Sequence, residues 1–100
     1  INIVEGYPAL INDPVVTRKS AEYAREYLGK DAVEELDIRM TAEDFAFFAE
    51  KYPSVLYRLG VRNRDMKHAL ELHTPNFNVD EESLKISMGT MAWIALSHLI

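Results

Sequence analysis

The first regular pattern of hydrophobic and polar positions along the chain has the spacing of an α-helix. Residues 14–28 carry an apolar stripe on one face, and charged residues occupy the other. Asp13 can accept hydrogen bonds from the first free N–H groups of such a helix, and Pro14 has no N–H to leave unpaired. Gly29 is suited to the end of the helix, because glycine tolerates the backbone conformations found there. We therefore predict a helix over residues 14–28.

A second helix is predicted from Thr41 to the residue before Pro53. Thr41 can act as its N-cap, and Asp44 three residues later completes a pair similar to a capping box. Pro53 ends the helix, because proline cannot donate a backbone hydrogen bond. The helix has a cluster of aromatic residues for which core packing is the simplest interpretation: Phe45, Phe47, Phe48 and Tyr52.

The third helix is predicted from about Glu81 to Ser97 or beyond, with Asp80 as its N-cap. Lys85 is its only Lys, Arg, Asp or Glu after the first turn. A helix that is apolar nearly all round must be covered on several sides. The rest of the chain cannot easily cover it. We infer that part of its packing partner lies outside this chain.

Shorter stretches alternate apolar and polar residues and predict three β-strands, over residues 1–5, 36–40 and 55–59. Strands and helices then alternate along the chain, which favours an α/β layer arrangement. A chain of 100 residues is long enough for one small domain.

The amino-acid composition limits the kinds of partner that we expect the chain to bind. The net charge is -5, and no basic run offsets it, so we expect neither nucleic acid nor membrane as a partner. The chain has no cysteine, which excludes disulfides, cysteine-based zinc sites and thiol catalysis. The apolar end of the chain, 84–100, is too short and too polar for a comfortable membrane span. No signal peptide precedes Ile1, and we expect a cytoplasmic location.

Candidate chemistry is sparse. His73 precedes Thr74 and Pro75, and a histidine in a stiff loop could bind zinc, manganese, cobalt or nickel. A hydrogen-bonded loop histidine is the simpler interpretation, since one histidine does not make a metal site. Glu43 and Asp44 open the second helix, where acids favour the helix dipole, and contact with a substrate is the alternative.

The two other histidines receive no catalytic role. His68 lies in a charged loop and is expected to be exposed. His98 lies near the end of the last helix, where a histidine can favour the helix terminus.

Three segments, in this order, resemble the C-terminal end of a metallopeptidase family. They are TAEDFAFF (41–48), VLYRLG (55–60) and LHTPNFNVDEESL (72–84), the last being the most specific. Upstream, GYPALIND (6–13) is similar to the family's passage from its lid domain into its catalytic domain. This family includes aminoacylases, indole-conjugate hydrolases, hippurate hydrolases and dipeptide carboxypeptidases. The resemblance covers nearly the whole chain.

The resemblance implies an α/β fold. The chain would be a C-terminal fragment of a mixed-sheet di-metal peptidase catalytic domain, with three helices and about three strands. Residues 1–8 would be the end of the lid, or dimerisation, domain and its connector. Residues 9–100 would be the C-terminal segment of the catalytic domain. The parent enzyme would be a homodimer formed through the lid domain.

The resemblance also implies an amidohydrolase that cleaves N-acyl amino acids or small peptides with a metal-activated water. Two divalent metal ions (Zn, Mn, Co or Ni) would be bound, with His73 as the one ligand from this chain. Glu43 and Thr41 would line the substrate pocket, and Thr41 stands where the family usually has glycine. The general-base glutamate and the other ligands would lie upstream of Ile1. No catalytic residue is therefore expected in this chain, and the 100 residues alone are expected to be inactive.

Two alternatives remain open at this stage. The chain could be a small non-enzymatic α/β module that binds a partner through the apolar face of its last helix, since exposed apolar patches mark interfaces. It could also be a family member that has lost its metals and keeps a ligand-binding role. The amidohydrolase and the binding module differ in what they predict for His73. Replacing this residue should abolish the activity of the parent enzyme, but it should leave a binding module nearly unaffected.

Overall fold

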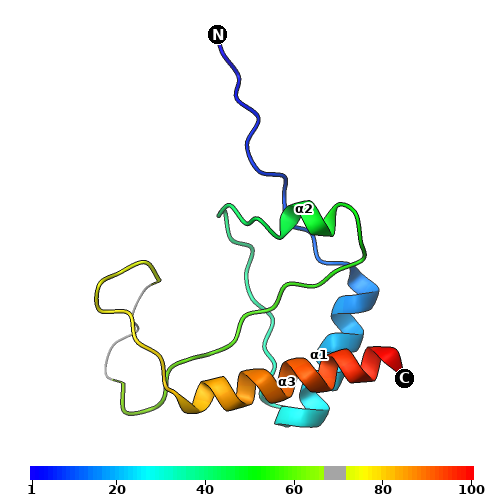
Figure 1. Cartoon of the computed structure of the whole chain (residues 1–100), viewed down its shortest axis with the longest axis vertical. Helices are drawn as coiled ribbons and strands as arrows, with labels where there is room; N and C mark the ends of the chain where they lie inside the picture. Colours follow the sequence, from blue (N-terminus) through cyan, green and yellow to red (C-terminus); the bar gives the residue numbers. More distant parts are fainter. Residues whose placement is uncertain (67–71) are drawn as a thin grey trace.

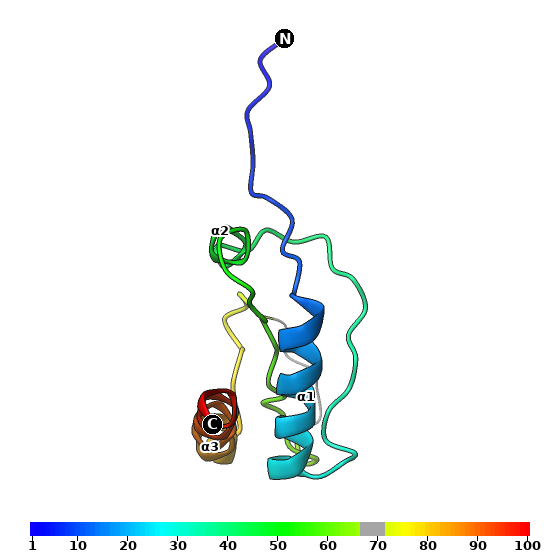
Figure 2. The same cartoon turned by 90° about the vertical axis from the view of Figure 1, so that its right-hand side faces the viewer.

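The computed structural model describes residues 1–66 and 72–100 (Figure 1). It contains the helices α1 (Pro14–Leu28), α2 (Ala46–Ala49) and α3 (Glu82–Leu99). Helices α1 and α3 lie against each other, whereas α2 lies beyond the N-terminal end of α1 (Figures 1 and 2). The first residues of the chain extend away from the three helices.

Helix α1 has the predicted bounds and the predicted caps. The Asp13 carboxylate accepts hydrogen bonds from the N–H groups of Val15 and Val16, each at 2.9 Å. At the other end Gly29 has a φ of 104°, in the region that glycine adopts most readily, and its N–H donates to the carbonyl oxygen of Arg25 at 2.8 Å. Local sequence signals were therefore sufficient to predict this helix.

Helix α3 also follows the prediction, but its start is shifted by one residue, so that Glu81 and not the predicted Asp80 occupies the N-cap position. The Asp80 carboxylate accepts a hydrogen bond from the N–H of Glu82 at 3.1 Å, so this side chain satisfies a free donor at the helix start. The carbonyl oxygen of Val61 accepts from the N–H of Asp80 at 2.7 Å and ties the start of α3 to an earlier segment.

The crossing of α1 and α3 depends on one glycine. A Cβ atom at Gly89 would overlap the hydroxyl group of Tyr27 and lie 2.7 Å from its ring carbon Cζ. Glycine at this position lets the Tyr27 ring lie directly on the α3 backbone. The same ring stacks on Trp93, with centroids 6.5 Å apart and an interplanar angle of 26°.

A polar contact fixes the other end of the same crossing. Ser20 Oγ and His98 Nε2 lie 2.9 Å apart, within hydrogen-bonding distance. The Tyr23 ring meets the His98 ring edge-on, with centroids 5.2 Å apart. The small core between the helices includes Ala24 and Ile94, which are 8% and 7% exposed. His98 thus serves the packing of the two helices.

Helix α2 is shorter than predicted, and Thr41 is not its N-cap. The α-helical part covers Ala46–Ala49, and Phe45 occupies the cap position without a side-chain hydrogen bond. The Glu43 carboxylate instead accepts from the N–H of Phe45 at 3.1 Å. This bond gives the backbone an alternative to a helix beginning at Thr41, and turns take the place of the expected first helical residues.

The aromatic cluster of this segment is not in a core. The ring centroids of Phe45 and Phe48 lie 6.0 Å apart. Phe48 is nevertheless 60% exposed and Tyr52 66% exposed, because nothing in the described part of the chain covers this side of α2.

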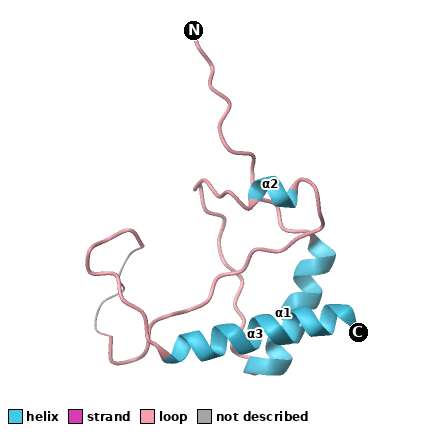
Figure 3. Cartoon of the chain, in the orientation of Figure 1, coloured by secondary structure: helices cyan, strands magenta, loops and turns pink. Residues whose placement is uncertain are grey.

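The three predicted strands are not formed in the residues that the structure describes (Figure 3). Segments 1–5, 36–40 and 55–59 have no regular secondary structure. A strand exists only when its backbone N–H and C=O groups pair with a neighbour, and these segments do not pair with one another. Ile3, Ile38 and Met40 are 88–96% exposed, which shows how little covers the first two segments.

The segment predicted as the third strand forms hydrogen bonds with the Asn12 side chain and does not pair with a neighbouring strand. Asn12 Nδ2 donates to the carbonyl oxygen of Leu56 at 2.9 Å, and Asn12 Oδ1 accepts from the N–H of Leu56 at 2.8 Å. The N–H of Asp13 donates to the carbonyl oxygen of Ser54 at 2.8 Å. These three bonds fasten residues 54–56 to the start of α1.

The chain is more open than a self-contained domain of its size. Its radius of gyration is 16.0 Å, whereas a compact domain of 100 residues has about 13 Å. Its accessible surface is 9034 Å², and a compact monomer of this mass exposes about 5800 Å². Much of the excess is apolar, and on α3 it includes Met88, Met91 and Leu96, each more than half exposed.

Candidate functional site

An open hollow of about 660 Å³ lies between the connector before α1 and the segments 36–43 and 56–58. Thr41 and Glu43, which the family resemblance places in a substrate pocket, both line it. Tyr57 and Arg58 line it from a second segment of the chain. Its volume lies within the usual range of small-molecule sites. The structure thus places the two expected pocket residues along one hollow, and their contact with a substrate stays a prediction.

The Glu43 side chain is half-buried and held by the turn that precedes α2. Its Oε1 atom accepts from the N–H of Phe45, which fixes the carboxylate against the backbone. Thr41 is exposed and two residues upstream in the same segment. The hollow is therefore lined by a fixed carboxylate and by a hydroxyl group.

Asp44 points to a different neighbour from Glu43. The Tyr7 hydroxyl hydrogen-bonds to the Asp44 carboxylate, and this bond and the negative charge raise the pKa of Tyr7 above its ordinary 10.0. The Tyr7 ring also lies against Phe47, with centroids 5.5 Å apart. Asp44 thereby connects the turn before α2 to the connector, while Tyr7 itself lines the hollow.

His73 lies outside this hollow. It is exposed, and among the described residues it is the only one other than glycine with a positive φ, at 66°. Histidine adopts this left-handed conformation more often than most residues, and such outliers gather at functional sites. Its segment, coloured yellow in Figure 1, leads into α3 and lies apart from α2.

The described part of the chain does not form a metal site by itself. In residues 1–66 and 72–100 no three His, Asp or Glu side chains are gathered closely enough to hold a metal ion. A metal ion bound by His73 would therefore need ligands beyond these residues, in line with the ligands expected upstream of Ile1. His68 lies outside the described residues, so its expected exposure is not tested.

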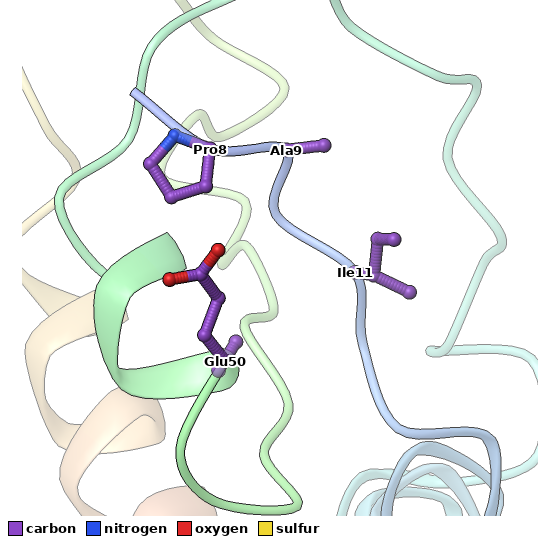
Figure 4. Close-up of a pocket in the computed structure, with 5 residues that line it drawn as sticks. Pro8, Ala9, Ile11 and Glu50 are labelled. Carbon is purple, nitrogen blue, oxygen red and sulfur yellow. The ribbon is translucent and has the colours of Figure 1, made fainter. Parts of the chain in front are cut away.

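A second, smaller hollow of about 280 Å³ lies between the connector and the C-terminal end of α2. Figure 4 shows Glu50 rising towards Pro8, with Ala9 and Ile11 further along the connector. Among the residues that the structure describes, Glu50 is the one ionisable residue that lines it. One carboxylate among small apolar groups offers no evident chemistry, and we assign it no function.

Most residues that line the larger hollow were not identified as site residues from the sequence. Asn12, Tyr57 and Arg58 are among them, and none of the three was given a role in a pocket from the sequence. The segment 55–60 was recognised as one of the three motifs that resemble the metallopeptidase family. Nothing in a single sequence shows which of its side chains face a hollow. Burial raises the pKa of Tyr57 above 10.0, and its hydroxyl donates to Met91 Sδ at 3.6 Å.

No helix in the described ranges combines the length and the apolar character needed to cross a membrane.

Comparison with known proteins gives a match along nearly the whole chain. The sequence model of peptidase family M20/M25/M40 matches residues 1–97. An IAA-amino acid hydrolase of Arabidopsis thaliana is 30% identical over 93 residues, which are 93% of this chain and 20% of that relative. An N-acetyldiaminopimelate deacetylase of Lactobacillus helveticus (strain DPC 4571) is 35% identical over 79 residues, 79% of this chain and 19% of that relative.

A protein of Rhodococcus jostii (strain RHA1) whose name describes a glutamate–cysteine ligase is 33% identical over 99 residues. The match covers 99% of this chain and 12% of that relative, so its name carries no argument for the activity of this chain. The chain thus spans between 12% and 20% of the length of these three relatives. No solved structure matches the chain significantly.

Proposed function

Because the chain belongs to peptidase family M20/M25/M40, a family of metal-dependent hydrolases, we propose that it is the C-terminal part of an amidohydrolase for N-acyl amino acids or small peptides. The observation that carries this proposal is the match over residues 1–97, within which Thr41 and Glu43 line one hollow. Two relatives support the substrate class, since one is named for amino acid conjugates of IAA and the other for an N-acetylated amino acid.

The proposal assigns the chain's residues as follows. Residues 1–8 are the end of the lid domain and its connector, and residues 9–100 are the C-terminal segment of the catalytic domain. His73 provides one ligand to a centre of two divalent ions, which are Zn, Mn, Co or Ni. The other ligands and the general-base glutamate come from upstream of Ile1, and the lid domains of two protomers form a homodimer.

The residues of this chain would bind and orient the substrate. When bound, the metal ions supply an activated water for hydrolysis of the amide. Glu43 is held in place by the N–H of Phe45 and presents its carboxylate at the hollow. The hydroxyl of Thr41 is free to bond to a polar group of the substrate, because it is exposed at the same hollow. A carboxylate held in place in this way lowers the entropic cost of positioning the amide.

The full-length protein tests the proposal. We expect it to hydrolyse N-acetyl amino acids, to lose the activity on chelation and to regain it with at least one of Zn, Mn, Co and Ni. Absence of hydrolysis by the metal-loaded protein, or activity that survives complete metal removal, would overturn the proposal.

The isolated 100-residue chain provides a second test. It should show no hydrolysis, because it holds no complete metal site in its described residues. Metal-dependent hydrolysis of N-acetyl amino acids by this chain alone would show that the division of ligands is wrong.

The exposed apolar surface of α3 fits the same proposal. A non-enzymatic module would use this surface for a partner protein. The chain spans no more than 20% of the three relatives described above, so the rest of the protein is the more economical cover for α3. The two interpretations separate in the hydrolysis assay, because a binding module has no metal-dependent activity.

A further inference from the structure

Tyr7, on the connector before α1, contacts the segment around the start of α2 at two points. Its hydroxyl donates a hydrogen bond to the Asp44 carboxylate. Its ring lies against the Phe47 ring, with centroids 5.5 Å apart and an interplanar angle of 58°. Because the two contacts fall on different residues, they restrict rotation of the connector against this segment as well as separation from it.

The residues that Tyr7 contacts belong to one hydrogen-bonded turn that includes Glu43. The carbonyl oxygen of Glu43 accepts a hydrogen bond from the N–H of Ala46 at 3.1 Å. The carbonyl oxygen of Asp44 accepts one from the N–H of Phe47 at 3.2 Å. The Glu43 carboxylate accepts from the N–H of Phe45 at 3.1 Å. A contact that holds Asp44 and Phe47 therefore also holds Glu43.

The segment that leads into Glu43 is loosely packed. Residues 36–43 have no regular secondary structure, and Ile38 and Met40 are 94% and 96% exposed. A segment with so little cover cannot fix the direction of the residue that ends it. The position of Glu43 therefore depends on the contacts of the turn that follows, and these include the contacts of Tyr7.

The connector is also fastened to the second wall of the hollow. The Asn12 side chain forms two hydrogen bonds with the backbone of Leu56. Tyr7 and Asn12 both line the hollow, as do Glu43 on one side and segment 56–58 on the other. The connector thus joins the two walls, and the contacts of Tyr7 determine where Glu43 lies relative to segment 56–58.

We propose that Tyr7 is a positioning residue for the substrate pocket, and that its contacts with Asp44 and Phe47 hold the Glu43 carboxylate where the substrate binds. This inference rests on the proposed function, because that function supplies the contact between Glu43 and a substrate. Tyr7 acts through Glu43 and takes no part in breaking the amide bond.

The kinetic test is a double-mutant cycle in the full-length enzyme, with an N-acetyl amino acid as the substrate. Tyr7→Phe keeps the ring and removes the hydroxyl. It should raise KM by about 3- to 10-fold, as expected for loss of one hydrogen bond, and leave kcat within about twofold. In a Glu43→Ala background the same change should alter KM by less than about twofold, because no carboxylate remains to be positioned.

Tyr52→Phe is the matched control. Tyr52 follows α2, is 66% exposed and does not line the hollow, so loss of its hydroxyl should leave KM unchanged. If Tyr7→Phe raises KM by the same factor with and without Glu43, Tyr7 acts on the substrate or on the fold independently of Glu43. That result overturns the proposal, as does a KM that Tyr7→Phe leaves unchanged in the otherwise wild-type enzyme.

Hydrogen exchange separates this proposal from the proposed function, because it needs no turnover. Metal-loaded full-length wild type, Tyr7→Phe and Tyr52→Phe are transferred to D2O, and residues 41–48 are followed by mass spectrometry. Tyr7→Phe should speed exchange there by about 3- to 10-fold, since the bond between the Phe45 N–H and Glu43 opens more often, whereas Tyr52→Phe should not.

Faster exchange in a protein that hydrolyses no N-acetyl amino acid would refute the proposed function and still support the hold of Tyr7 on Glu43. Equal exchange in wild type and Tyr7→Phe would overturn the inference, whatever the kinetics show.

Discussion

Tyr7 and Asp44 join the connector to the turn before α2, and their contact has a consequence for pH. The pKa of Tyr7 is raised by the hydrogen bond to Asp44 and by its charge. Tyr7 therefore loses its proton at higher pH in the folded chain than in the unfolded chain. The contact contributes stability below pH 10.0, and this contribution is lost as the pH rises through the folded pKa.

We predict that Asp44→Asn lowers the pKa of Tyr7 towards 10.0, because the negative charge is removed. Absorbance of the phenolate across a pH titration of the full-length protein measures the change. The difference between each protein and the same protein with Tyr7→Phe isolates the signal of this tyrosine. A Tyr7 pKa that is the same in wild type and Asp44→Asn would contradict the contact.

Single residues were predictable from the sequence where their role is local. Asp13 and Gly29 act on backbone groups within a few residues, so a capping pattern identifies them. The left-handed backbone of His73 has no such signal, since histidine is not required there by any turn pattern. The resemblance indicated a role for His73, and the structure adds its unusual backbone conformation.

At the scale of the helices, the contact of Gly89 with Tyr27 sets how closely α1 and α3 approach. Alanine is more favourable than glycine inside a helix by about 0.8–1.0 kcal/mol. Against this, a methyl group forced into packed side chains costs about 1–3 kcal/mol. The Cβ atom would overlap the Tyr27 hydroxyl, so the Tyr27 ring would have to leave Trp93.

We therefore predict that Gly89→Ala lowers the free energy of unfolding of the full-length protein by about 1 kcal/mol. In a Tyr27→Ala background the same substitution should instead raise it by about 0.8–1.0 kcal/mol, since only the helix preference remains. Denaturant unfolding of the four proteins measures both effects. The same sign in both backgrounds would show that Tyr27 does not rest on Gly89.

Helices and strands were not equally predictable. The bounds of α1 follow from its caps and its periodicity, and the start of α3 is marked by the hydrogen bond from the N–H of Glu82 to Asp80; these signals act within one segment. The segment 36–40 has the alternation of a strand, but in the described chain no neighbouring segment pairs with it. Helix α2 is shorter than predicted because Glu43, rather than Thr41, accepts a hydrogen bond from the backbone just before the helix. A pattern can show that a segment could pair in a sheet, but the pairing itself depends on a second segment.

At the scale of the whole molecule, the apolar surface of α3 shows where the rest of the protein should lie. Leu96 is 57% exposed in this chain. If the rest of the protein covers α3, Leu96 becomes a core residue. The scarcity of charged residues along the helix predicted that α3 needs more cover than this chain can give.

We predict that Leu96→Gln destabilises the full-length protein by about 2–5 kcal/mol, the range for losing a buried leucine. In the isolated chain the change should stay within about 0.5 kcal/mol, because the position is exposed. Lys85→Gln on the exposed side of α3 should have little effect in either protein, since exposed ion pairs contribute little. Thermal or denaturant unfolding provides the comparison. An equally small effect of Leu96→Gln in both proteins would show that the rest of the protein does not cover this side of α3.

The candidate site was predictable only in part. The motifs identified Thr41, Glu43 and His73, and the structure places the first two along one hollow and His73 outside it. A complete site needs groups that the described residues do not bring together. Asn12 and Arg58 could not be assigned from their spacing, because their position at the hollow depends on how segment 54–58 lies against the start of α1.

The central claim is that this chain gives a metal ligand, His73, to an amidohydrolase. The most direct test is the hydrolysis of an N-acetyl amino acid by full-length His73→Ala, with bound metal measured on the same samples. His98→Gln, which removes an imidazole engaged with α1, is the matched control. We predict that His73→Ala lowers kcat/KM by more than about 100-fold and reduces bound metal, whereas His98→Gln retains both. Full activity and full metal content in His73→Ala would contradict the account.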